Sequence, residues 1–174
     1  FSVIFLTTLI GAGQGLFMAL VTGQVYSLAN LLEPQDSVTF YAMGSFLAMI
    51  LLLLGLVAAV FHLGKPSYFL TRAWRGITQW RTSWLSRELL ALPAFMVLVI
   101  LFGAAHFFEL TEPMFVIKGQ LPVDPTLILG VVGAFLSIVL FVSTAMIYAS
   151  LRFLQEWHSP FTVANFIFFG LASG

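Results

Sequence analysis

Two short polar segments, His62-Leu-Gly-Lys-Pro66 and Ser83-Trp-Leu-Ser-Arg-Glu88, stand between two long apolar runs at residues 40–63 and 89–108. A helix that crosses a bilayer needs about 20 predominantly apolar residues, and both runs reach that length. The stretch between them therefore predicts a connection that returns the chain to the membrane. The imidazole of His62 and the carboxylate of Glu88 lie at the edges of these apolar runs. Ionisable groups are costly there and by default indicate function.

The composition indicates a membrane protein. Of the 174 residues, 60% are hydrophobic and only 8% are charged, whereas a soluble domain is about a quarter charged. The mean hydropathy of +1.05 agrees with this interpretation. Seven acidic and seven basic residues leave no basic excess for a nucleic-acid surface. The absence of cysteine excludes disulfides and thiolate-bound iron–sulfur clusters from this chain.

The apolar pattern predicts an all-α fold, a single polytopic transmembrane helix bundle over residues 1–174. The chain begins at Phe1 and stops at Gly174 inside apolar runs, which indicates a part of a longer protein. Ser37 and Ser83 are expected to cap the helices that follow them. Four complete helices and the start of a fifth are expected, at about 1–29, 38–63, 83–110, 126–154 and 160–174.

The loop charges predict how the bundle lies in the membrane. Lys and Arg are enriched in loops on the cytoplasmic side. The loop at 65–82 is strongly basic, whereas the loop at 30–39 has two acids and no Lys or Arg. The basic loop, and with it His62 and Glu88, is therefore expected to face the cytoplasm. Its basic side chains are expected to contact lipid head groups or to dock a partner: Lys65, Arg72, Arg75 and Arg81.

His62 and Glu88 form the leading candidate site. They flank one loop on consecutive antiparallel helices, so they can lie at one membrane depth. An imidazole and a carboxylate near the interface can exchange the protons that accompany quinone oxidation or reduction. The simpler alternative is that Glu88 pairs with a neighbouring arginine and that His62 caps its helix. His106 is expected at the opposite face, so it cannot share a haem iron or a zinc ion with His62.

The first helix carries two polar side chains that need partners, Gln14 and Gln24. Nearby glycines, which include Gly11 and Gly13, allow helices to approach closely. Hydrogen bonding between helices is the preferred interpretation for the two glutamines, and contact with a ligand is the alternative. The helix centres are otherwise apolar, which disfavours a transporter, because transporters bind their substrates and coupling ions near the midplane.

The two polar segments resemble the membrane anchor subunit of the dimethyl sulfoxide reductase family, through His62-Leu-Gly-x-Pro66 and Ser83-Trp-Leu-Ser-Arg-Glu88 with a basic aromatic loop between them. The longer stretch that begins at Trp80-Arg-Thr is most similar to the anchors of sulfite-oxidising members. Leu154-Gln-Glu-Trp-His-Ser-Pro160 is similar to the family's pattern after its fourth helix. The match covers most of the chain.

The resemblance implies an anchor of eight transmembrane helices in the cytoplasmic (inner) membrane of a prokaryote, with this chain as its first half. It implies a molybdopterin catalytic subunit and an iron–sulfur subunit as partners, no haem in the anchor, and electron exchange with ubiquinone or menaquinone. The family's quinone-site residues fall on His62, Gly64 and Glu88. We add Arg87, the neighbour of Glu88, to the predicted quinone site.

Two directions of electron flow stay open at this point. In sulfite oxidation the anchor would pass electrons from the iron–sulfur subunit to quinone. In a reductase of the dimethyl sulfoxide type it would pass them from quinol to the iron–sulfur subunit. A purely structural anchor and a transporter are the alternatives from other functional classes.

Overall fold

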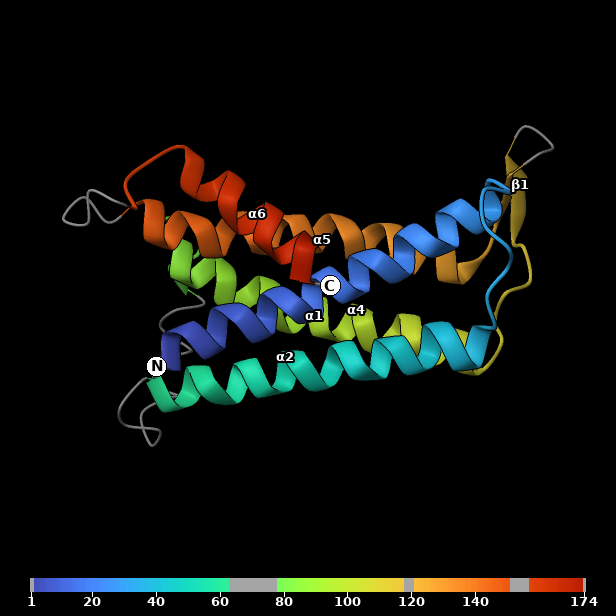
Figure 1. Ribbon diagram of the computed structural model, residues 1–174, viewed down its shortest axis with the longest axis horizontal. Helices are drawn as coiled ribbons and strands as arrows, with labels where there is room; N and C mark the ends of the chain where they lie inside the picture. The colour runs from blue at the N-terminus through green and yellow to red at the C-terminus, as the bar shows by residue number, and fades with distance from the viewer. Residues whose placement is uncertain (1, 63–77, 118–120, 151–156, 174) are drawn as a thin grey trace.

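A computed structural model describes residues 2–62, 78–117, 121–150 and 157–173, and it confirms an all-α membrane bundle (Figure 1). Four helices are long and apolar enough to cross a membrane. A shorter apolar helix, α6 (Phe161–Ser173), packs against the first and last of these four. The four long helices are α1 (Ser2–Leu28), α2 (Met43–His62), α4 (Trp84–Phe107) and α5 (Pro125–Ala149).

The helices are arranged so that α1 packs against α2 and α6, while α4 packs against α5. Figure 1 shows that α2 ends at the same end of the bundle at which α4 begins. This agrees with the expected reversal of the chain between the second and third spans. Ser83 caps α4 as predicted, because its side chain accepts a hydrogen bond from the backbone N–H of Ser86.

The second span begins with a π-helical segment, η1 (Ser37–Ala42), which continues into α2. The prediction that Ser37 caps this helix is wrong. Asp36 is the cap, because its Oδ2 accepts a hydrogen bond of 2.5 Å from the backbone N–H of Thr39. The Ser37 hydroxyl lies within the helix and is 2.7 Å from Nδ1 of His106. An aspartate and a serine side by side can both cap a helix, so the local sequence does not decide between them.

The cap makes the start of η1 sensitive to pH. The backbone N–H and the side chain of Thr39 hold the pKa of Asp36 below its ordinary value. The stabilisation is therefore complete above the ordinary carboxyl pKa, and it is lost as the pH falls through the lowered pKa of the folded state. We expect Asp36→Ala to speed amide hydrogen exchange in residues 37–42 at neutral pH, measured by mass spectrometry as a protection factor.

The difference in protection between Asp36→Ala and the parent protein should vanish at a pH below the folded pKa of Asp36. Glu33→Ala is the matched control, because Glu33 is an exposed acid of the same loop. Equal protection of residues 37–42 in the parent protein and in Asp36→Ala at neutral pH would contradict this role of Asp36.

The connection between α4 and α5 contains a short hairpin that the sequence does not predict. Strands β1 (Phe115–Ile117) and β2 (Leu121–Val123) pair antiparallel, with Phe115 opposite Val123. Each strand has only three residues, which is too short for the alternating pattern that marks a strand. Pro122 is in addition an unusual strand residue. The hairpin leads directly into Asp124, which caps α5.

The centre of the bundle is an aromatic cluster around Phe17 of α1. The Phe17 ring meets Phe95 and Phe102 of α4 edge to face, with ring centroids 5.3 and 5.2 Å apart. All three side chains are fully buried. Gly133 of α5 provides the room, because a Cβ at this position would lie 2.6 Å from Cζ of Phe17. The glycine therefore sets how closely α5 approaches α1.

A buried polar network lies at the end of the bundle where α4 finishes. Nε2 of Gln24 donates to Oγ1 of Thr126 at 2.6 Å, and this hydroxyl donates to Oδ1 of Asp124 at 2.8 Å. The buried ring of His106 stacks on Tyr41 with centroids 4.5 Å apart. For Gln24, the predicted hydrogen bond between helices is confirmed.

Candidate functional site

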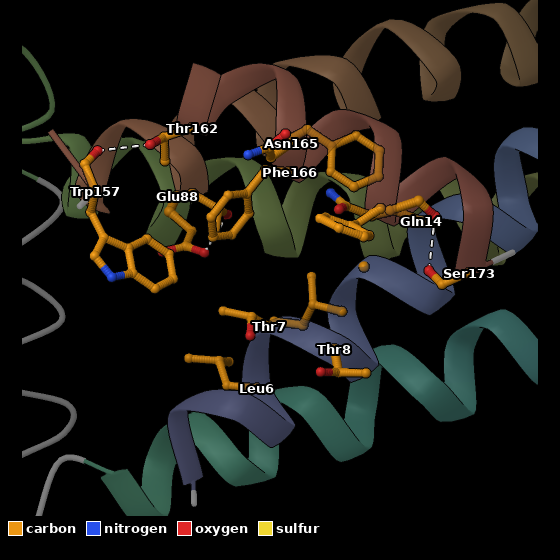
Figure 2. A pocket seen from close by; sticks show the side chains of 16 residues that line it. Leu6, Thr7, Thr8, Gln14, Glu88, Trp157, Thr162, Asn165, Phe166 and Ser173 are labelled. Carbon is orange, nitrogen blue, oxygen red and sulfur yellow. Dashed lines mark hydrogen bonds between the residues drawn. The ribbon is translucent and has the colours of Figure 1, made fainter. Parts of the chain in front are cut away.

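A cavity of about 630 Å³ lies between α1, α4, α5 and α6 (Figure 2). It lies toward the end of the bundle at which α4 begins and α5 ends. Half of its sixteen lining residues have polar side chains, Glu88 among them, and the others are aromatic, aliphatic or glycine. The volume is typical of a site for a small organic molecule, and the lining combines an apolar surface with several polar side chains.

Glu88 supplies the ionisable group of this cavity. It lies in the second turn of α4 and is half-buried. Oγ1 of Thr144 on α5 donates a hydrogen bond of 2.6 Å to Oε1 of Glu88. The carboxylate is therefore held by a neutral hydroxyl on the facing helix, and it lines a space that a ligand can enter.

The sequence left open that Glu88 pairs with a nearby arginine. Neither Arg81 nor Arg87 does so in the described structure. The Arg87 guanidinium donates to the backbone oxygens of Trp80 and Arg81 at 3.0 and 3.1 Å. It also lies over the ring of Trp84, 4.1 Å from the centroid. Among the described residues, neither Arg81 nor Arg87 forms an ion pair with Glu88.

Arg87, which we predicted as a quinone contact, lies on a different surface. It lines an apolar groove between α4 and α5, together with Trp80 and Trp84. It is not among the described residues that line the cavity of Glu88. Arg81 is exposed, and its guanidinium lies 5.3 Å from the ring centroid of Trp80. The structure thus separates these two arginines from Glu88.

The remaining predicted site residues lie at or beyond the edge of the described structure. His62 is the last residue of α2, and its side chain is outside the described part. The predicted quinone contact Gly64 and the predicted docking residues Lys65, Arg72 and Arg75 also lie outside the described residues. The pairing of His62 with Glu88 stays a prediction.

An aromatic group from the last part of the chain forms one wall of the cavity. Trp157 and Phe166 line it directly, and the ring of Tyr148 stacks on Phe166 with centroids 5.3 Å apart. Figure 2 shows Trp157, Phe166 and Glu88 around the same space. Flat aromatic side chains beside a carboxylate suit a planar ring that also carries polar atoms. The sequence alone indicates only interfacial or packing roles for Trp157 and Tyr148.

Gln14 of α1, for which the sequence left a hydrogen bond between helices or a ligand contact open, also lies at this cavity. Its side chain is only 2% exposed and lines the cavity. Its Nε2 has no hydrogen-bond partner among the described residues. The preferred interpretation, a hydrogen bond between helices, is therefore not met for the amide nitrogen of Gln14.

Comparison with known proteins gives one family and one curated relative. The model of the family described as DMSO reductase anchor subunit (DmsC) matches residues 1–174. A sulfite dehydrogenase subunit from Allochromatium vinosum is 59% identical over 174 residues, which is 100% of this chain and 52% of that relative. The chain thus spans about half the length of the curated relative that it matches. No solved structure matches the chain.

Proposed function

The chain belongs to the DMSO reductase anchor subunit family, and from that membership we propose that it anchors a molybdopterin and iron–sulfur oxidoreductase in the membrane and binds its quinone. The observation that carries the quinone site is the Glu88 carboxylate, which lines a cavity with an aromatic wall and several polar side chains and is bound by a hydroxyl. The four apolar spans make the protein a multi-pass membrane protein.

The cavity fits the chemistry of a quinone. A quinone head group is a flat ring with two hydrogen-bond acceptors, and its tail is apolar. The aromatic wall of Trp157 and Phe166 suits the ring, and Leu6, Ile10 and Phe169 offer an apolar surface. The volume of about 630 Å³ falls within the ordinary range for ligand sites. When bound, a quinone supplies a carrier of two electrons and two protons.

The residues of the cavity then have distinct roles. The carboxyl oxygens of Glu88 hold or release a proton at the ligand, which is general acid and base chemistry. Thr144 orients that carboxyl group through its hydroxyl. Trp157 and Phe166 exclude water from the polar end of the site. His62, by the resemblance of its segment to the family, is the second proton-exchanging group of the proposal.

The proposal also includes the two partner subunits and the side of the membrane on which they bind. We place the iron–sulfur subunit and the molybdopterin subunit on the cytoplasmic side, where the basic loop at 65–82 would lie against lipid and partner. The relative named as a sulfite dehydrogenase subunit favours sulfite oxidation, with electrons running to quinone. The second candidate is a quinol-oxidising anchor of a dimethyl sulfoxide-type reductase, and it uses the same cavity in the opposite direction.

A photoreactive azidoquinone tests where the ligand binds. In the full-length protein within its complex, we expect saturable labelling of peptides from α1 and α6, the walls of the cavity, and loss of the label when unlabelled quinone is added. Peptide mass spectrometry locates the label. Labelling confined to the groove between α4 and α5 would place the site elsewhere. The absence of saturable labelling would favour a purely structural anchor.

A further inference from the structure

Gln14 has an amide nitrogen with no partner among the described residues, deep in an apolar bundle. Nε2 of Gln14 is buried, and no described residue accepts a hydrogen bond from it. A buried donor without an acceptor is costly, and in native proteins each such group calls for an explanation, such as a ligand or an ordered water. Ten residues later on the same helix, Nε2 of Gln24 donates to Thr126, although Oε1 of Gln24 has no partner among the described residues.

The surroundings of Gln14 leave the cavity as the source of an acceptor. Gly11, one turn earlier on the same face of α1, faces α6, because a Cβ on Gly11 would lie 3.8 Å from Cα of Gly170. A Cβ on Gly170 would in turn collide with the ring of Phe141. Gly11, Gly170 and Phe141 all line the cavity, and none of them has a polar side chain that could accept from Gln14. Figure 2 shows the Gln14 side chain reaching into the space between α1 and α6.

Gln14 and Glu88 lie at different depths. Gln14 is twelve residues beyond the start of α1, whereas Glu88 is four residues beyond the start of α4, and both helices begin at the same end of the bundle (Figure 1). At about 1.5 Å per residue, Gln14 is nearer to the bilayer centre. Among the polar side chains that line the cavity, Glu88 thus lies nearer to the interface, and Gln14, which does not titrate, lies farther in.

We propose that Gln14 is a ligand of the quinone, donating a hydrogen bond from Nε2 to the carbonyl oxygen that points toward the bilayer centre, while Glu88 serves the opposite oxygen. This inference rests on the proposed quinone site. An amide is suited to both redox states, because its N–H donates to a quinone oxygen and its carbonyl accepts from a quinol hydroxyl. The two ring oxygens would then be held by chemically different groups.

Gln14→Met tests the inference, because methionine has a similar length and shape but cannot donate a hydrogen bond. The probe is a short-tailed ubiquinone, or menaquinone, labelled with ¹³C at one carbonyl at a time and bound to the full-length complex. In Gln14→Met we expect one carbonyl band in the infrared difference spectrum to move to higher frequency. We expect the Kd for the quinone to rise about tenfold, as for one lost hydrogen bond.

Gln24→Met is the matched control, because it changes the same side chain on the same helix away from the cavity. It should leave both carbonyl bands and the Kd unchanged. The thermal stability of the ligand-free complex should not fall in Gln14→Met, since the substitution removes an unpartnered polar group. If this variant fails to assemble, Gln14→Asn, which keeps the amide but shortens its reach, should shift the same band by a smaller amount.

The outcomes separate this inference from the proposal on which it rests. Unchanged bands and Kd in Gln14→Met, with a changed band in Glu88→Gln, would show that Gln14 holds at most a water molecule and would overturn the inference alone. If the parent complex does not bind the labelled quinone saturably, or if neither variant alters a band, the proposed quinone site itself fails.

Discussion

Replacing Glu88 by glutamine should lower quinone-coupled turnover of the assembled complex by about 10²- to 10⁴-fold, the usual loss when a general acid or base is removed. Glutamine keeps the size of the side chain and can still accept the hydrogen bond from Thr144, so the bundle should fold and the partner subunits should still assemble. The measurement compares electron transfer between substrate and quinone with the activity of the molybdenum subunit toward a soluble redox dye.

Only the quinone-coupled rate should fall in Glu88→Gln. We expect His62→Ala to behave in the same way, because we propose that its imidazole shares the proton exchange. Glu112→Gln is the control, since Glu112 is an exposed acid beyond the other end of α4. Normal quinone kinetics in both Glu88→Gln and His62→Ala would refute the proposed role of this end of the bundle.

The second large effect concerns the fold. Gly133→Val should destabilise the protein by about 3 kcal/mol, the upper part of the range for overpacking a tight core. A Cβ at this position would lie 2.6 Å from Cζ of Phe17. Phe17 is fully buried between Phe95 and Phe102, so its ring has no free space into which it can move. The measurement is thermal unfolding of the purified protein in detergent, with the yield of folded protein as a second readout.

A matched glycine elsewhere separates this clash from the general effect of replacing glycine in a helix. A Cβ at Gly23 of α1 would lie 3.7 Å from the ring of Phe40, which is an ordinary contact. Gly23→Ala should therefore be neutral or stabilising, because alanine is the better helix former. Gly133→Ala should be less stable than Gly23→Ala. Equal stability of the two alanine variants would contradict the close packing of α5 on Phe17.

The sequence predicts the spans well, because the length of an apolar run is a property of the chain alone. The start of α4 follows from local capping rules, because Ser83 is its N-cap, and this start places Glu88 in the second turn of the helix. The same rules could not decide whether Asp36 or Ser37 caps η1, and the structure shows that Asp36 does.

The walls of the cavity could not be predicted, since they depend on which helix faces meet. Gln14 and Gln24 are the same residue on the same helix. They are ten residues apart, so a period of 3.6 residues turns them to different faces. One faces Thr126 and the other lines the cavity, and only the packing of α5 and α6 on α1 decides which. The aromatic wall depends on the packing of α6 in the same way, because Phe166 meets Tyr148 across two helices.

The fully buried aromatic cluster around Phe17 also separates two levels of the bundle that carry titrating side chains. Glu88 and His106 are 18 residues apart on α4, which is about 27 Å at 1.5 Å per residue and close to the thickness of the hydrocarbon layer. Between these two levels α4 carries no Asp, Glu, Lys, Arg or His, and Phe95 and Phe102 occupy its buried face. Within the described helices, a proton taken up at Glu88 therefore has no chain of titrating side chains leading to the far surface. If Glu88 exchanges protons with a quinone as we propose, we therefore expect that exchange on one side of the bilayer, with no charge moved through the membrane potential by this part of the bundle.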